Sequence, residues 1–258
     1  MYVKFLFIVI LNATIVMLTS YGNHNTDDTA KSIIDKKEFA VLELFTSEGC
    51  SSCPPADELM AKIQNEYKDQ PVYLLAFHVD YWDRLGWKDV FSNADYSNRQ
   101  REYGDRLSGG TLYTPQLVVN GKYEFVGSDE FKVRKAISKA LATEHSTTLT
   151  IQSKQQDDKL ILNYQVSKAS KESRILVAVI QKSATTKVER GENSGHLLSH
   201  VQIVRKLHSE AVTKGGEGTT GLRLPREFNS TDWEVIAMIQ DLNSGEILTA
   251  TRVNYNKL

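Results

Sequence analysis

The chain contains only two cysteines, Cys50 and Cys53, and they follow an apolar run at residues 40–45. Two thiols with two residues between them can close a small, reversible disulfide. The run before the pair is typical of a buried strand, and residues 57–67 after it repeat apolar side chains on one helical face. The pair therefore stands where a strand turns into a helix, and we predict a strand, Cys-x-x-Cys, helix unit.

A second apolar run at residues 71–79 completes a strand, helix, strand unit. A crossover of this kind pairs its two strands in parallel. A helical insertion is predicted near residues 93–107, and Asn120-Gly121 between two apolar runs predicts a type I′ hairpin. With a last helix, residues 38–143 are predicted to form one α/β domain with the element order β-α-β-α-β-β-α.

The pattern changes after His145, where short alternating segments follow one another with polar turns between them. This spacing predicts an all-β, sandwich-like domain at residues 147–256. A chain of 258 residues is long enough for two domains.

The N-terminus has the pattern of an export signal. Lys4 precedes an apolar stretch at residues 5–18, which is short for a bilayer span. We predict a signal peptide at 1–22, cleaved after Gly22, then a flexible lead-in at 23–37 and no transmembrane span after processing. An uncleaved anchor is the alternative. We expect an exported protein, periplasmic or secreted, where an oxidising environment lets a disulfide persist.

Three separate strings carry a family resemblance: LFTSEGCSSCPPAD at 44–57, HVDYWD at 78–83 and TPQ at 114–116. With the order of elements, they resemble a family of exported thioredoxin-like proteins known as the domain of unknown function 1223. The resemblance implies an α/β thioredoxin-like domain with a helical insertion, and it continues into the β-rich half. It implies a redox role but supplies no established substrate.

The thioredoxin resemblance also implies roles for individual residues. Cys50 would be the exposed attacking thiol, and Cys53 the buried thiol that resolves the mixed disulfide. Thr114 and Pro115 match a cis-proline loop that faces the pair and binds an extended substrate segment. Glu43 matches a buried acid that carries a proton to the resolving thiol, and a hydrogen-bonded structural glutamate is the alternative.

Residues around the pair oppose strong activation of a thiolate. A helix N-terminus favours a thiolate through its dipole and its free N–H groups. The prolines at 54–55 have no N–H group, and Glu48, Asp57 and Glu58 add negative charge nearby. We therefore expect a modestly activated Cys50 and a stable disulfide, which makes the pair a reducing couple.

His78, Asp80 and Trp82 follow the second predicted strand. Sites in parallel sheets gather at the carboxyl ends of the strands, so these residues are predicted to line the rim of the site and bind substrate. The alternative is a packed aromatic loop with Trp87 and Phe91 at its centre.

The sequence favours a thiol–disulfide oxidoreductase without a cofactor, which acts on protein or small-molecule thiols or disulfides and is recycled by a redox partner. A net charge of -1 provides no basic field, so no nucleic acid is expected. Two alternatives stay open: an envelope binding protein with a structural disulfide, and a copper-handling protein in which His78 joins the thiols. No metal site is predicted, because a zinc site needs four ligands and His196, His200 and His208 lack a paired spacing.

Overall fold

The computed structural model describes residues 38–168 and 172–254. The predicted signal peptide at 1–22 and lead-in at 23–37 lie outside these residues. The helices are α1 (Pro54–Glu66), α2 (Ala94–Leu107) and α3 (Glu130–Leu141), with a short 3-10 helix η1 (Asp83–Leu85). The strands are β1 (Ala40–Thr46), β2 (Val72–His78), β3 (Gln116–Val119), β4 (Tyr123–Val126), β5 (Thr148–Gln156), β6 (Lys159–Ser167), β7 (Ser173–Lys187), β8 (Leu197–Ala211), β9 (Glu217–Arg223), β10 (Trp233–Asp241) and β11 (Ile247–Arg252).

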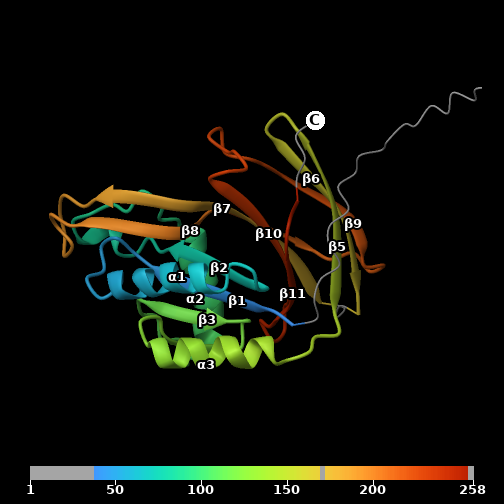
Figure 1. Cartoon of the computed structure of the whole chain (residues 1–258), viewed down its shortest axis with the longest axis horizontal. Helices are drawn as coiled ribbons and strands as arrows, with labels where there is room; N and C mark the ends of the chain where they lie inside the picture. Colours follow the sequence, from blue (N-terminus) through green and yellow to red (C-terminus); the bar gives the residue numbers. More distant parts are fainter. Residues whose placement is uncertain (1–37, 169–171, 255–258) are drawn as a thin grey trace, which may run out of the picture.

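One mixed sheet runs through most of the molecule, in the order β11-β10-β7-β8-β2-β1-β3-β4 (Figure 1). β1 and β2 are parallel, with Glu43 opposite Leu75, and β2 is also parallel to β8, where Ala76 pairs with Ile203. β3 is antiparallel to both β1 and β4. The sheet therefore continues across the boundary predicted between residues 143 and 147, and the division into two domains stays a prediction.

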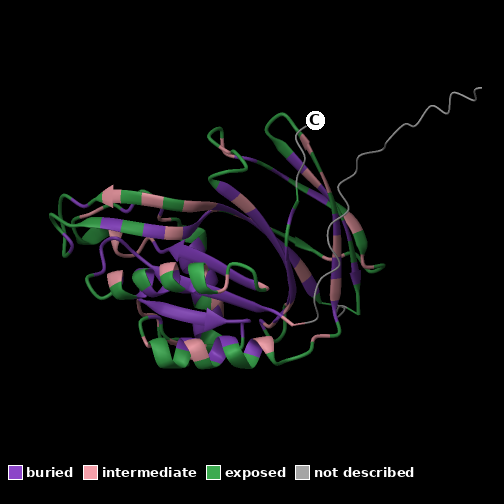
Figure 2. Ribbon diagram, viewed as in Figure 1, coloured by how far each residue is buried: buried purple, intermediate pink, exposed green. Residues whose placement is uncertain are grey.

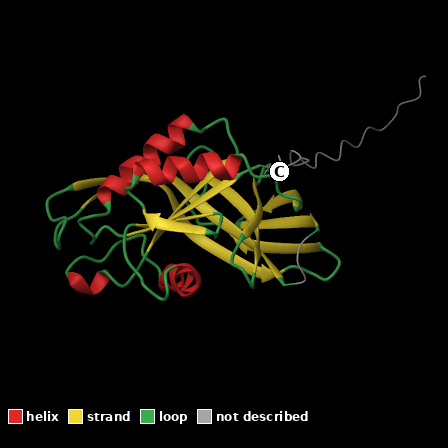
Figure 3. Ribbon diagram, turned by 90° about the horizontal axis from the view of Figure 1, so that it is seen from below, coloured by secondary structure: helices red, strands yellow, loops and turns green. Residues whose placement is uncertain are grey.

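Helices cover both faces of the sheet around β1, with α1 and α3 on one face and α2 on the other (Figure 3). Because side chains alternate along a strand, Leu42 and Leu44 share a core with α1 and α3, whereas Val41 and Phe45 share a core with α2. β1, β2 and β3 are consequently buried along their whole length (Figure 2). No helix among the described residues is long and apolar enough to cross a membrane.

A second sheet, with the antiparallel order β5-β6-β9, covers the outer end of the large sheet. Ile151 and Leu162 from this sheet share a core with Val177 of β7 and Val235 of β10. The region after residue 147 is all β with two packed layers, as predicted. It differs from a separate sandwich because β7, β8, β10 and β11 belong to the large sheet. β8 pairs with the edge of β2, which would otherwise be left open.

The predicted hairpin is confirmed at Asn120 and Gly121, whose φ angles of 49° and 66° are both positive. Asn120 also joins distant segments, because its side chain accepts from the Val41 N–H at 2.6 Å and donates to the Phe39 carbonyl oxygen at 3.2 Å. A Cβ atom at Gly121 would lie 2.0 Å from the carbonyl oxygen of Gly245. Only glycine therefore fits where this turn meets the β10–β11 connection.

Candidate functional site

Cys50 and Cys53 form a disulfide at the start of α1, with their Cα atoms 5.4 Å apart. Cys53 is the N-cap residue of α1, and the helix begins at Pro54. The predicted strand, Cys-x-x-Cys, helix unit is thus confirmed. Both cysteines are 0% exposed, so Cys50 is not the exposed residue that the sequence predicted. Thr114 and Asn193, from two other parts of the chain, contact Cys50.

The first turn of α1 offers little to stabilise a thiolate. Its first two residues are prolines, which have no N–H group. The next two N–H groups, those of Ala56 and Asp57, both donate to the carbonyl oxygen of Cys53, at 2.9 and 3.2 Å. The N–H groups at this helix start are therefore missing or already bonded, which supports the expectation of a weakly activated thiolate.

Thr114 lies directly against the disulfide. The Thr114–Pro115 bond is cis, as predicted, and the Thr114 carbonyl oxygen is 3.8 Å from the Sγ of Cys50. The hydroxyl of Ser52 donates to the same carbonyl oxygen at 3.3 Å. The indole Nε1 of Trp82 donates to the Thr114 hydroxyl at 2.9 Å. The structure thus brings the predicted residues Trp82 and Thr114 together beside the cysteines.

The connection between β7 and β8, residues 188–196, is fastened to the cysteine segment, and we call it the cover loop. The side-chain amide of Asn193, which is 5% exposed, donates to the carbonyl oxygens of Glu48 at 2.9 Å and Cys50 at 3.0 Å. The carboxylate of Glu192 accepts from the N–H and the hydroxyl of Ser51, at 3.0 and 2.7 Å. The cover loop therefore holds the backbone on both sides of Cys50.

Glu192 and Asn193 are functional candidates that the sequence did not predict. The alternating sequence pattern predicts strands at residues 174–181 and 201–207, with a long connection between them. In the structure, β7 and β8 extend further and leave only a short connection. Glycines with positive φ at 191 and 195 mark this tight connection. No local pattern shows that it reaches the Cys50 carbonyl, 143 positions earlier in the chain.

His78 and Asp80 have other partners than the disulfide. His78 is fully buried, and its Nδ1 lies 2.6 Å from the Oδ2 of Asp89. The carboxylate of Asp80 accepts from the hydroxyl of Ser97 on α2. Of the three rim residues that the sequence predicted after β2, only Trp82 is placed beside Thr114 by a hydrogen bond.

Glu43 lies on the α2 face of the sheet, away from the helix that carries the cysteines. Its two carboxylate oxygens accept from Nε and Nη2 of Arg99, at 2.5 and 2.9 Å, and from the Tyr103 hydroxyl at 2.6 Å. Gln240 donates to the same hydroxyl at 3.0 Å. Burial lowers the pKa of Arg99, but the Glu43 carboxylate outweighs it and raises the pKa. We call this group the Glu43 network, and its contacts match the structural alternative.

The described side chains are not arranged to bind a metal ion. Throughout residues 38–168 and 172–254, no three His, Cys, Asp or Glu side chains are grouped so that they could hold a metal ion. The three histidines of the β-rich half differ in their surroundings, however. His196 is exposed and His208 is partly exposed, whereas His200 is 1% exposed and faces Glu48 and Asp57. Sequence spacing alone did not separate His200 from the other two.

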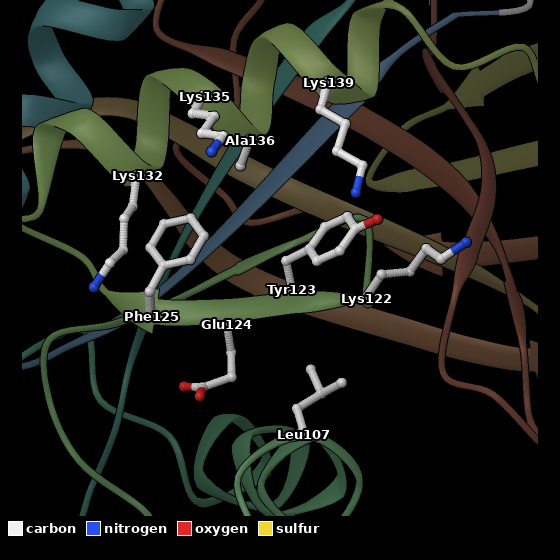
Figure 4. Close-up of a pocket in the computed structure, with 9 residues that line it drawn as sticks. All are labelled: Leu107, Lys122, Tyr123, Glu124, Phe125, Lys132, Lys135, Ala136 and Lys139. Carbon is white, nitrogen blue, oxygen red and sulfur yellow. The ribbon is translucent and has the colours of Figure 1, made fainter.

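A groove of about 390 Å³ lies along the edge strand β4, between α3 and the end of α2 (Figure 4). Tyr123 and Phe125 point from β4 toward α3, and Lys139 lies over the Tyr123 ring at 4.4 Å. The groove is basic and partly aromatic, and it is separate from the disulfide. Its lining residues are Leu107, Lys122, Tyr123, Glu124, Phe125, Lys132, Lys135, Ala136 and Lys139.

Fold and site define a mixed α/β protein with a Cys-x-x-Cys disulfide at the start of a helix. The chain belongs to the family described as protein of unknown function DUF1223, whose model matches residues 41–240. The family resemblance seen in the sequence is thereby confirmed.

Solved structures similar to this chain include the two that follow. Protein AGR_C_4864 from Agrobacterium tumefaciens is 26% identical with a TM-score of 0.65, and the match covers 87% of this chain and 98% of that one. A domain of the outer membrane lipoprotein Omp28 from Porphyromonas gingivalis is 13% identical with a TM-score of 0.27, over 43% of this chain and 89% of that one. The second match is too distant to support an inference. The search of curated proteins found no match.

Proposed function

We propose that this protein is an exported thiol–disulfide oxidoreductase with a thioredoxin-like domain, in which Cys50 attacks and Cys53 resolves. The order from β1 to α3 is the order of elements on which the thioredoxin resemblance rests. The observation that carries the proposal is the contact between the Cys50 Sγ and the Thr114 carbonyl oxygen, at 3.8 Å. A client segment that pairs with the backbone of Thr114 would place its sulfur next to Cys50.

We further propose that the couple is reducing. The prolines at 54–55 remove N–H donors from the helix start, and Glu48 and Asp57 are buried acids in the same segment. His200 supplies one positive charge against these two carboxylates, which leaves the group negative. Negative charge disfavours a thiolate. The disulfide is therefore stable, and the dithiol readily donates electrons.

The clients are protein or small-molecule thiols or disulfides, and a redox partner outside the cytosol returns the pair to its starting state. The N-terminal pattern supports export, and an oxidising compartment would maintain the disulfide. In this proposal the cover loop opens before a client reaches Cys50, because both cysteines are fully buried when it is closed.

The burial of both cysteines favours a second candidate, in which the disulfide is structural and the protein binds a partner. A structural disulfide holds the start of α1 in place and turns over nothing. The two candidates differ in whether the folded protein exchanges electrons.

Insulin reduction with a dithiol donor separates the two candidates. We expect turnover by the mature wild-type protein and none by the double variant Cys50→Ser/Cys53→Ser, with Ser138→Ala, at an exposed position of α3, as a control that keeps both cysteines. In the native compartment, Cys53→Ser is expected to trap clients on Cys50 as mixed disulfides that mass spectrometry identifies. Absence of both turnover and adducts would support the structural disulfide.

A further inference from the structure

A group of buried titratable side chains lies beside the disulfide and has no part in the exchange steps described so far. Glu48 is 0% exposed, His200 is 1% exposed and Asp57 is 7% exposed. They come from the β1–α1 connection, from β8 and from α1, and the buried pair of His78 and Asp89 lies next to them. We call these five residues the His200 cluster.

The imidazole of His200 lies between two carboxylates at distances just beyond hydrogen bonding. Its Nε2 is 3.5 Å from the Oε1 of Glu48, and its Nδ1 is 3.7 Å from the Oδ2 of Asp57. Among the described residues, neither ring nitrogen nor the Oε1 of Glu48 has a hydrogen-bond partner. Buried polar atoms are rarely left in this state, because each costs free energy that a bond would recover. A shift of a few tenths of an ångström would close either contact.

Asp57 links His200 to the cysteines. Its N–H donates to the carbonyl oxygen of Cys53 at 3.2 Å, so the first turn of α1 is helical and the side chains of residues 53 and 57 are neighbours on one face. The Thr46 hydroxyl contacts the Oδ2 of Asp57 at 3.4 Å. The carboxylate is therefore held on the side of α1 that faces β1, one helical turn from Cys53 and 3.7 Å from the imidazole.

We propose that Asp57 and His200 form a proton relay for Cys53, a role that rests on the proposed exchange function. When a client thiolate attacks the Sγ of Cys50, the bond between the two Sγ atoms breaks and its electron pair stays on Cys53 as a thiolate. The proton of the His200 imidazolium moves to Asp57 and from there to this thiolate. In the reverse direction, the Cys53 thiol returns its proton to Asp57 as its sulfur attacks the mixed disulfide and the client leaves as a thiolate.

The carboxylates around His200 favour its protonated form, which is the proton donor of the relay. Burial lowers the pKa of His200, but Asp57 and Glu48 outweigh it and raise the pKa to about 9. The imidazole is therefore protonated at neutral pH and can donate. The groups that face it are Glu48 from the β1–α1 connection, Asp57 from α1 and His78 from β2 with its partner Asp89, while Phe91 separates it from Arg205.

The relay also gives a reason for joining the β-rich half to the large sheet. β8 pairs with β2 at Ala76 and Ile203, which places His200 against the segment that carries the cysteines. The same half supplies the cover loop. The β7–β8 hairpin would then supply both the cover loop and His200, the proton donor of the relay.

The first test needs no client. The ring signals of His200 are followed by NMR during a pH titration of the disulfide form and of the form reduced with a phosphine, with His200→Gln used for assignment. Because the cysteines and the relay share protons, we expect the midpoint of His200 to differ between the two forms by about half a pH unit or more. Identical midpoints would overturn the relay.

The second test is kinetic. Asp57→Asn is compared with Glu58→Gln, an exposed residue next to it on α1, so that both variants lose one negative charge near the helix start. We expect Asp57→Asn to slow reduction of the disulfide by a dithiol by about 100-fold and to change the pH profile, and Glu58→Gln to behave as wild type. Equal rates and profiles in the two variants would overturn the relay.

The outcomes also separate the relay from the proposed function. Turnover of insulin by wild type, with Asp57→Asn and Glu58→Gln equally active, overturns the relay alone. A wild type that reduces no client, but whose His200 midpoint shifts with the redox state, overturns the proposed function and supports the proton coupling.

Discussion

The molecule buries two groups of acidic side chains on opposite faces of one sheet, and their hydrogen bonding differs sharply. In the Glu43 network, both carboxylate oxygens accept from Arg99, and one also accepts from Tyr103. In the His200 cluster, the Oε2 of Glu48 accepts from the Trp87 indole and the Oδ2 of Asp57 from the Thr46 hydroxyl, but the Oε1 of Glu48 and both ring nitrogens of His200 have no such bond among the described residues. An unpaired buried polar atom costs about 1–3 kcal/mol. The comparison distinguishes an acid that holds the fold from acids available for proton transfer.

The largest effect is expected in the Glu43 network. Arg99→Met leaves the Glu43 carboxylate buried without its charged partner, and breaking such a pair lowers the free energy of unfolding by about 3–5 kcal/mol. Urea denaturation followed by circular dichroism measures the change.

The double variant Glu43→Leu/Arg99→Met is the control for this prediction. It removes both charges and is expected to recover most of the lost stability, since no buried charge is left unpaired. A loss below about 1 kcal/mol in Arg99→Met would show that the pair contributes no more than an exposed one, and would remove the contrast between the two groups.

The His200 cluster is expected to make stability depend on pH. The pKa of His200 is raised by folding from 6.5 to about 9, so the protonated ring stabilises the fold fully below pH 6.5 and loses this contribution as the pH rises through 9. The integrated effect is about 3 kcal/mol at most. Urea denaturation of the disulfide form at pH 6 and pH 9.5 measures it in wild type and in His200→Gln.

His208→Gln serves as the matched control, because His208 lies on the same strand but is partly exposed. We expect wild type and His208→Gln to lose stability equally over this pH range, and His200→Gln to lose clearly less. A decline as steep in His200→Gln as in wild type would place the titrating group elsewhere.

The two acid groups also show where sequence reasoning reaches its limit. The Cys-x-x-Cys unit and the Asn120-Gly121 turn are local patterns, and both were predicted correctly. Glu43 was matched to the cysteines by its distance along the chain, but side chains alternate on a strand. Glu43 therefore shares the face of Val41 and Phe45, while α1 packs on the other face. Which face a helix covers is decided by tertiary packing.

The residues that the sequence did not predict are all contributed by distant segments. Asn193 is 143 positions from Cys50, and Glu192 is 141 positions from Ser51. In the sequence, nothing distinguishes His200 from the other histidines of its region. In the structure, β8 places it beside Asp57. Composition and residue spacing do not reveal such contacts, because the contacts depend on the pairing of β8 with β2.

A smaller effect is expected at the cover loop, whose side chains bond to the segment that carries Cys50. Asn193→Ala removes two hydrogen bonds to the backbone around Cys50, each worth about 1 kcal/mol. Reduction of the disulfide by a small dithiol under native conditions should then be faster by about tenfold or more. Trapping the new thiols with a maleimide over time measures the rate.

Ser194→Ala provides the comparison for Asn193, since its exposed hydroxyl bonds only within the loop, to the Glu189 carbonyl oxygen. We expect this variant to be reduced at the wild-type rate. If Asn193→Ala were also reduced at that rate, the loop would not control access to the disulfide.

The smallest effect is expected at Glu192, which is exposed and bonds to the N–H and hydroxyl of Ser51. These bonds lower the pKa of Glu192 from its ordinary 4.5, so they are present above that value and are lost as the pH falls through the lowered pKa. Glu192→Ala should speed reduction of the disulfide by about threefold or less, because exposed charged contacts contribute little. Glu189→Gln removes a charge from the same loop and should leave the rate unchanged. An effect of Glu192→Ala larger than that of Asn193→Ala would mean that the outer edge of the loop, rather than its buried amide, holds the site closed.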